Sequence, residues 1–157
     1  MVLSEVYRVQ NIKPDLASAT KEDLFGELAD FLAEREGLDD KAKDKILAAL
    51  WTREQMLSTV IAPHIALPHA SLRGQKRTLG VFAVSKNGID YGSLDGKPVH
   101  IVMLLIDDRY ETRKHLKTLQ KAAELIGSPN FYSKIMSCAT PAEVHAIITE
   151  IEEMQTV

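Results

Sequence analysis

Hydrophobic residues in the first third of the chain recur every three or four positions, the spacing of amphipathic helices. Thr20 and Asp23 have the T-x-x-D spacing of a capping box, which predicts the start of one helix. Asp39 or Asp40 can cap a second helix, which we expect to extend to about Arg53. The apolar stripes of these two helices are Leu24, Leu28, Phe31 and Leu32, and then Ile46, Leu47, Leu50 and Trp51.

The pattern changes to that of β-strands in the middle of the chain. Residues 78–84 and 98–106 are nearly continuous runs of β-branched and other apolar residues, separated by glycines. Strands without polar alternation are typical of sheets that helices cover on both faces. Shorter strands are expected at 6–9 and at 65–67.

Helical spacing returns after the second long run. Ser128 and Thr140 each place a hydroxyl before a proline, an arrangement typical of helix starts, so two further helices are expected after the first. The order of elements predicts one α/β domain over residues 1–157, with a core from about 5 to 152. We expect a mixed β-sheet flanked by helices on both sides. The helix expected directly after the run 98–106 has an apolar stripe of Leu116, Leu119, Ala123 and Ile126.

Composition and charge narrow the classes of partner. The 157 residues include 19 basic and 22 acidic side chains mixed along the chain, which does not favour binding to nucleic acid or to an anionic membrane surface. No purely apolar run is longer than that at 101–106, which is far shorter than the roughly 18 residues of a membrane span, so no direct membrane insertion is expected. Cys138 is the single cysteine, which excludes an internal disulfide and fits a cytoplasmic location.

Candidate chemistry is concentrated in the stretch TVIAPHIALPHA, residues 59–70, which holds two Pro-His pairs. His64 and His69 are five positions apart, so on a regular strand they would point to opposite faces, and a shared metal is not expected. The usual interpretation of a single histidine is a surface or core residue, and we apply it to His64, His100 and His145. No metal or other cofactor is predicted.

His69 differs from the other histidines in its surroundings. Pro68 lacks the N–H needed to continue a strand, and Ala70 and Ser71 add little bulk beside the ring. We therefore expect His69 at a strand end, exposed and easily approached. Because a neutral imidazole is a competent nucleophile toward a phosphoryl group, phosphoryl transfer is a candidate activity.

The residues around His69 carry a specific resemblance. The pattern begins with an acidic residue, then six unspecified positions, then an apolar and a small residue. Two more unspecified positions follow, and then the run apolar, Ala, apolar, Pro, His and a small residue. This pattern resembles the active-site signature of enzyme IIA domains of the fructose, mannitol and nitrogen-regulatory type in the bacterial phosphoenolpyruvate-dependent phosphotransferase system. Similarity at 18–34, 49–54, 88–105 and 115–135 extends it to nearly the whole chain. The signature positions are Glu54, Ile61, Ala62, Ile65, Ala66, Leu67, Pro68, His69 and Ala70.

The resemblance implies a mannitol-type enzyme IIA fold and a phosphohistidine carrier. His69 would accept a phosphoryl group from an HPr-type carrier protein. His115 matches the supporting histidine of the family, and Arg53 matches the arginine linked to its site. A planar guanidinium and a ring N–H are both suitable donors to a phosphoryl group. Further candidates for phosphate contact or partner docking are Ser58, Thr59, Leu67 and Ala70.

Other interpretations of these residues stay open from the sequence alone. Arg53 could be a solvated side chain at a helix end, and His115, with lysines on both sides, could be a surface residue. Ser58 and Thr59 could be local caps instead of phosphate ligands. The carboxylates between 107 and 111 are interpreted as helix N-terminal charges and not as catalytic groups.

Three functions are compatible with this resemblance. A nitrogen-regulatory switch, in which phosphorylation changes binding to a regulated protein, is modestly favoured because the sequence has no HPr-like domain, enzyme IIB segment or membrane portion. A sugar-uptake component that donates to a cysteine of an enzyme IIB domain is the alternative. The third is an inactive partner-binding relative. It is considered because other residues stand where this family usually has glycines, in the loop before the histidine and directly after it. The replacing residues are Val60, Ala62, Pro63, His64 and Ala70.

Overall fold

Two long antiparallel strands, β5 and β6, form the centre of a six-stranded sheet in the computed structural model, which describes residues 2–155. On the outer side of β5 lies β1, in parallel, and β6 pairs in parallel with both β3 and β4. The short strand β2 runs antiparallel to β3 at the sheet edge. The strands are β1 (Ile12–Lys13), β2 (Val60–Ala62), β3 (Ile65–Ala66), β4 (His69–Leu72), β5 (Leu79–Ile89) and β6 (Val99–Asp108).

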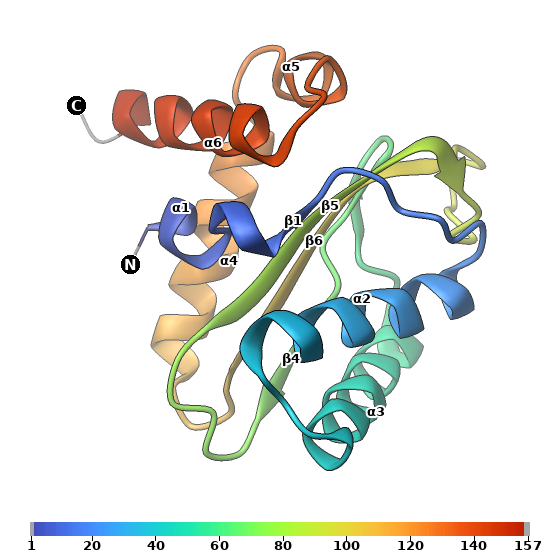
Figure 1. Cartoon of the computed structure of the whole chain (residues 1–157), viewed down its shortest axis with the longest axis vertical. Helices are drawn as coiled ribbons and strands as arrows, with labels where there is room; N and C mark the ends of the chain where they lie inside the picture. The colour runs from blue at the N-terminus through green and yellow to red at the C-terminus, as the bar shows by residue number, and fades with distance from the viewer. Residues whose placement is uncertain (1, 156–157) are drawn as a thin grey trace.

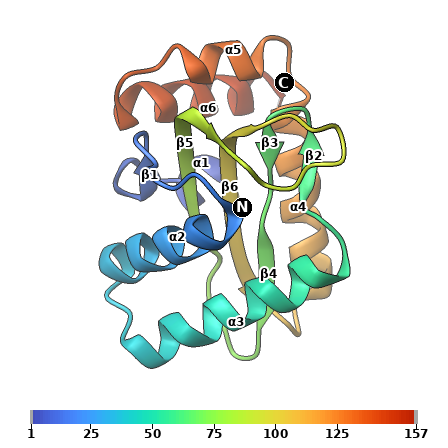
Figure 2. The same cartoon turned by 90° about the vertical axis from the view of Figure 1, so that its right-hand side faces the viewer.

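Helices cover both faces of this sheet, which Figure 1 shows nearly edge-on and Figure 2 shows turned by 90°. Helices α2 and α3 pack on one face, and the helices from the two ends of the chain pack on the other. The helices are α1 (Leu3–Val6), α2 (Lys21–Glu36), α3 (Asp40–Met56), α4 (Thr112–Ile126), α5 (Phe131–Met136) and α6 (Pro141–Gln155), with a 3-10 turn at Val9–Asn11.

Strand β6 is covered by helices on both faces, which explains why its sequence lacks polar alternation. Its odd-numbered residues from 101 to 105 pack against the helices α4 to α6, and its even-numbered residues from 102 to 106 pack against α2 and α3. Because both faces are covered, every position between them is apolar. The predicted α/β domain, with a mixed sheet flanked by helices on both sides, is confirmed. Residues 1 and 156–157 of the expected domain range lie outside the described residues.

Local hydrogen bonds form the predicted helix starts. The Thr20 hydroxyl accepts from the N–H of Asp23 at the start of α2, and the Asp39 carboxylate accepts from the N–H of Ala42 at the start of α3. Thr140 caps α6 in the same way, accepting from the N–H of residue 143. These boundaries could be predicted because each hydrogen bond spans only three residues.

Two expectations about local structure are wrong. The expected strand at 6–9 is instead the end of α1 and a 3-10 turn, because the carboxylate of Glu152 in α6 accepts from the N–H groups of Leu3 and Ser4 and caps α1. Helix α5 begins two residues later than the Ser128-Pro129 pair predicts, after Asn130 in the left-handed conformation (φ 63°). Within residues 2–155, none of the helices combines the length and apolar character needed to cross a membrane.

Gly80 of β5 tests how tightly the N-terminal segment packs on the sheet. A Cβ at this position would lie 2.7 Å from Cγ1 of Val6 and 2.8 Å from Cε1 of Tyr7. We expect Gly80→Ala to lower the free energy of unfolding by about 1–3 kcal/mol, because the fully buried Tyr7 ring would have to move. Urea unfolding followed by circular dichroism measures the change.

Gly26→Ala is the matched control. Gly26 lies inside α2, and no heavy atom lies within 4 Å of its added Cβ. The same substitution there should leave stability unchanged or raise it by up to about 1 kcal/mol, because alanine has the higher helix propensity. Wild-type stability in Gly80→Ala would contradict the packing described here.

Candidate functional site

Strands β3 and β4 are two parts of one interrupted strand along β6. Ile65 pairs with Ile101 and His69 with Leu105, so the register is the same on both sides of the break. Pro68 has no N–H to donate, as expected, but its carbonyl accepts from the N–H of Leu105 at 3.1 Å. Strand pairing therefore resumes at once. His69 opens β4 and is half-buried there, so the expectation of an exposed strand end is wrong in this respect.

Two hydrogen bonds fix the ring of His69. Its Nδ1 lies 2.8 Å from the carbonyl of Leu67, which can only accept, so Nδ1 carries the proton. The electron pair is then on Nε2, to which Nε of Arg53 donates at 3.3 Å. Arg53 is held in turn by the carbonyl of Leu57, which accepts from Nη1 at 2.7 Å. Nε2 is therefore the nucleophilic atom of His69.

The surroundings of His69 favour its neutral form. Burial lowers the pKa of His69 below its ordinary value of 6.5. The hydrogen bond to the Leu67 carbonyl is the next largest effect and raises this pKa, whereas the charges of Arg53 and His115 lower it. The carboxylate of Glu54 raises it least, and the pKa stays below its ordinary value. A neutral imidazole keeps its nucleophilic electron pair near neutral pH.

His115, in the first turn of α4, lies beside His69 with 5.6 Å between the ring centroids. Its Nδ1 donates to a carboxylate oxygen of Asp107 at 3.1 Å, and the hydroxyl of Thr78 donates to the other oxygen. Burial raises the pKa of Asp107, but these donors outweigh burial and lower it, so the carboxylate is charged. Asp107 thus fixes the orientation of His115. Within the described residues the Nε2 of His115 has no hydrogen-bond partner.

Asp107 is the site residue that the sequence interpretation missed. It is the last but one residue of β6 and is 1% exposed, so it is not a helix N-terminal charge. The signal was present in the alternation of β6, since residues 101, 103 and 105 face α4 to α6 and 107 continues the same face. A carboxylate at a buried position of a strand requires donors, and His115 is one of them.

A second buried carboxylate, Glu54, anchors the end of α3. It accepts from Nζ of Lys21 at 3.1 Å, from the N–H and hydroxyl of Thr59 at 3.0 and 2.6 Å, and from the hydroxyl of Tyr91 at 3.0 Å. Burial raises the pKa of Glu54, but these donors outweigh burial and lower it. The carbonyl of Thr59 accepts from the N–H of Leu67 at 2.8 Å. The chain between α3 and β4 is therefore fixed at both ends.

The remaining candidate residues lie as follows. The hydroxyl of Ser58 accepts from the N–H of Val60 at 3.4 Å, and Ser58 is half-buried. The hydroxyl of Thr59 is buried against the carboxylate described above. The side chains of Leu67 and Ala70 are buried in the two cores on opposite faces of the sheet. The structure therefore brings together His69, His115 and Arg53, and the Thr59, Leu67 and Ala70 side chains are covered.

His64 lies apart from this group. It occupies the turn between β2 and β3 with φ 68°, the left-handed conformation that favours glycine, so the loop keeps a glycine-type backbone without the glycine. Its Nδ1 lies 2.8 Å from the carbonyl of Pro98, and its ring packs near His100 and Tyr132. Within residues 2–155 no cluster of three or more His, Cys, Asp or Glu side chains could hold a metal ion.

Comparison with known proteins identifies the family. The family described as "Phosphoenolpyruvate-dependent sugar phosphotransferase system, EIIA 2" matches residues 5–151. The nitrogen regulatory protein of Bradyrhizobium diazoefficiens is 27% identical over 148 residues, which are 94% of this chain and 95% of that protein. The fructose-specific EIIABC component of Bacillus subtilis is 28% identical over 150 residues, which are 96% of this chain but only 23% of that protein.

Solved structures agree with this assignment. The crystal structure of the nitrogen regulatory protein IIA-Ntr from Neisseria meningitidis has a TM-score of 0.83 and 26% identity, and the match covers 93% of this chain and 98% of that one. The mannitol IIA of Escherichia coli shares the fold, with a TM-score of 0.73 and 17% identity over 90% of this chain and 97% of that one. The predicted mannitol-type fold is confirmed, and the chain belongs to the EIIA 2 family of the phosphoenolpyruvate-dependent sugar phosphotransferase system.

Proposed function

We propose that this chain is a phosphohistidine carrier, in which Nε2 of His69 accepts a phosphoryl group from an HPr-type protein. The observation that carries the proposal is the hydrogen bond from Nδ1 of His69 to the carbonyl of Leu67, which leaves the electron pair on Nε2. That electron pair forms the new N–P bond while the N–P bond of the donor breaks and its electrons return to the donor's imidazole. While Nδ1 keeps its proton, the phosphorylated ring is a cation, which keeps the N–P bond weak and the group transferable.

Arg53 and His115 have defined roles in this transfer. Nε of Arg53 now donates to the electron pair of His69, and after transfer that pair is used in the N–P bond. The guanidinium is then free to donate to the phosphoryl oxygens, and such charge-assisted hydrogen bonds are among the strong ones. Nε2 of His115, when it carries a proton, is a second donor beside the acceptor ring. Both residues therefore stabilise the loaded state.

The downstream role that we favour is that of a nitrogen-regulatory switch, acting in the cytoplasm on a regulated protein. Its support is the greater similarity to IIA-Ntr, in TM-score and in identity, than to mannitol IIA. The alternative is sugar uptake, with transfer from His69 to a cysteine of an enzyme IIB domain, and it is supported by the similarity to the fructose-specific component. The chemistry at His69 is the same in both roles. The ordered group of Arg53, His69 and His115 argues against an inactive relative.

The central prediction concerns the phosphorylated atom. Incubation with phosphoenolpyruvate, enzyme I and an HPr-type carrier should add one acid-labile phosphate, on Nε2 of His69, because Nδ1 already donates to a carbonyl. Phosphorus NMR at alkaline pH distinguishes the two ring isomers. His69→Ala should abolish labelling and His64→Ala should keep it. Labelling of Nδ1 or of His64 would contradict the assignment.

The second prediction concerns pH. Because burial and Arg53 lower the pKa of His69, an NMR titration of its ring protons should have a midpoint below 6.5. Below that midpoint Nε2 is protonated, so phosphoryl acceptance should fall as the pH drops through it. Arg53→Gln removes a neighbouring positive charge and should move the midpoint upward. A wild-type midpoint at or above 6.5 would be inconsistent with the buried, neutral ring.

The third prediction concerns Asp107, which acts through His115 as a positioning residue. Asp107→Asn removes the charge that orients His115, and we expect the phosphoryl transfer rate to fall by about tenfold or more. This magnitude is typical of carboxylates that orient metal-binding histidines in other proteins. Thr78→Val is the control, because it removes the other hydrogen bond to the same carboxylate and leaves His115 untouched. Equal losses in the two variants, or wild-type transfer in Asp107→Asn, would contradict the role of Asp107.

A further inference from the structure

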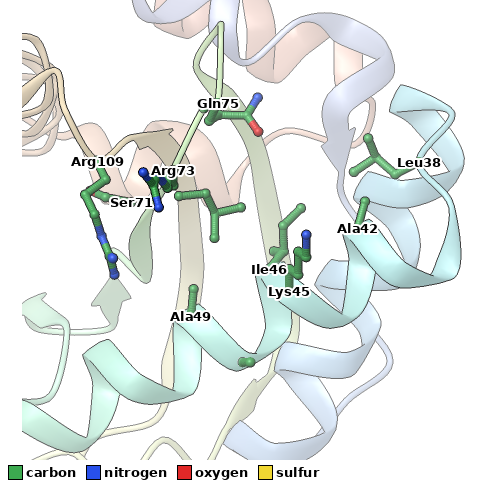
Figure 3. Close-up of a pocket in the computed structure, with 12 residues that line it drawn as sticks. Leu38, Ala42, Lys45, Ile46, Ala49, Ser71, Arg73, Gln75 and Arg109 are labelled. Atoms are coloured by element: carbon green, nitrogen blue, oxygen red, sulfur yellow. The ribbon is translucent and has the colours of Figure 1, made fainter.

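A cavity of about 500 Å³ lies between α3 and the segment that follows β4, apart from His69 and Arg53 (Figure 3). Its volume is within the range of small-molecule sites. One wall comes from α3 and the other from the end of β4 and the residue after β6.

The charge of this cavity is opposite to that of the chain. Three of its lining residues are cations, Lys45, Arg73 and Arg109, and none is a carboxylate, although the chain has a net charge of -3. In the part of the chain that the structure describes, the side chains of Lys45 and Arg109 form neither an ion pair nor a hydrogen bond, and Arg73 lies over the ring of Tyr110 at 5.7 Å. In Figure 3 both arginines lie on the wall opposite α3, the helix that carries Lys45. Such a group of like charges is stabilised by an anion.

Apart from Lys45, the residues of α3 that line the cavity are apolar. Ala42, Ile46 and Ala49 are at helical spacing on α3 and present mostly small side chains. Leu72 of β4 lines the cavity too and packs in the same core cluster as Ile46 and Ala49. Small side chains allow a flat ring to approach the helix closely. The cavity therefore combines an apolar patch on α3 with cations on both walls, Lys45 on α3 and the two arginines on the other wall.

We propose that this cavity binds a nucleoside di- or triphosphate, with the base against α3 and the phosphates on the three cations. Two planar guanidinium groups and one ammonium group match a polyphosphate chain of several negative charges, whereas a single carboxylate would leave most of this charge uncompensated. The helix and the strand that line the cavity also carry Arg53 and His69. A bound nucleotide thus contacts the same two elements as the acceptor site, but its binding does not depend on the proposed function.

The test is a titration of the full chain, labelled with ¹⁵N, with ATP and separately with GTP in the presence of EDTA. We expect saturable shifts of the backbone amide signals of Ala42, Ala49 and Gly74 with at least one of the two nucleotides. Arg109→Gln and Lys45→Gln should each weaken binding by about tenfold, since each removes a charge-assisted hydrogen bond. Lys97→Gln, which makes the same charge change as Lys45→Gln but before the start of β6, should bind like wild type.

Three results would overturn the proposal. One is the absence of saturable shifts at these amides at millimolar ATP and GTP. Another is equal weakening in Lys97→Gln, which would indicate only a general charge effect. The third is equally tight binding of inorganic tripolyphosphate, since the apolar patch on α3 would then contribute nothing to recognition. None of these outcomes involves phosphorylation of His69, so failure here and failure of the carrier function are distinguishable.

Discussion

The site depends on one constraint, the interrupted pairing of β3 and β4 with β6. The two short strands keep a single register on β6, so the position of His69 is set by the central strand of the sheet. Pro68 interrupts only the donor side of this pairing, since its carbonyl still accepts from Leu105. Beside the break, the carbonyl of Leu67 accepts the ring proton of His69. A main-chain feature of the sheet thus determines which ring nitrogen of His69 carries the proton.

Two buried carboxylates support this histidine through two different neighbours. Glu54 fixes the end of α3, where the adjacent Arg53 approaches His69, and Asp107 orients His115 from the end of β6. In both cases the donors outweigh the effect of burial, so each carboxylate keeps its charge. Removal of one donor would leave a buried charge less compensated, which explains why both carboxylates have several partners. The ring of His69 itself is favoured in its neutral form because it is half-buried and faces a cation.

Helix α3 contributes to two separate regions of positive charge. Arg53 near its C-terminal end donates to the ring of His69, and Lys45, about two turns earlier, lines the cavity with Arg73 and Arg109. The first region has defined partners within the protein. Among residues 2–155, by contrast, the side chains of Lys45 and Arg109 form no ion pair or hydrogen bond, and Arg73 contacts an aromatic ring. The first region is thus held in one arrangement by the protein itself, whereas the cations of the second are exposed to solvent.

The sequence by itself determined the features that depend on neighbours a few residues away. Thr20 and Asp39 cap their helices through bonds that span three residues, and the continuous apolar runs required a sheet covered on both faces. His69 was identified from its own short motif. The tertiary structure alone decided that α1 forms, because its N-terminal donors bond to Glu152 some 148 residues away, and that Asp107 orients a histidine. Such contacts depend on which surfaces meet after folding, and this is not encoded in local spacing.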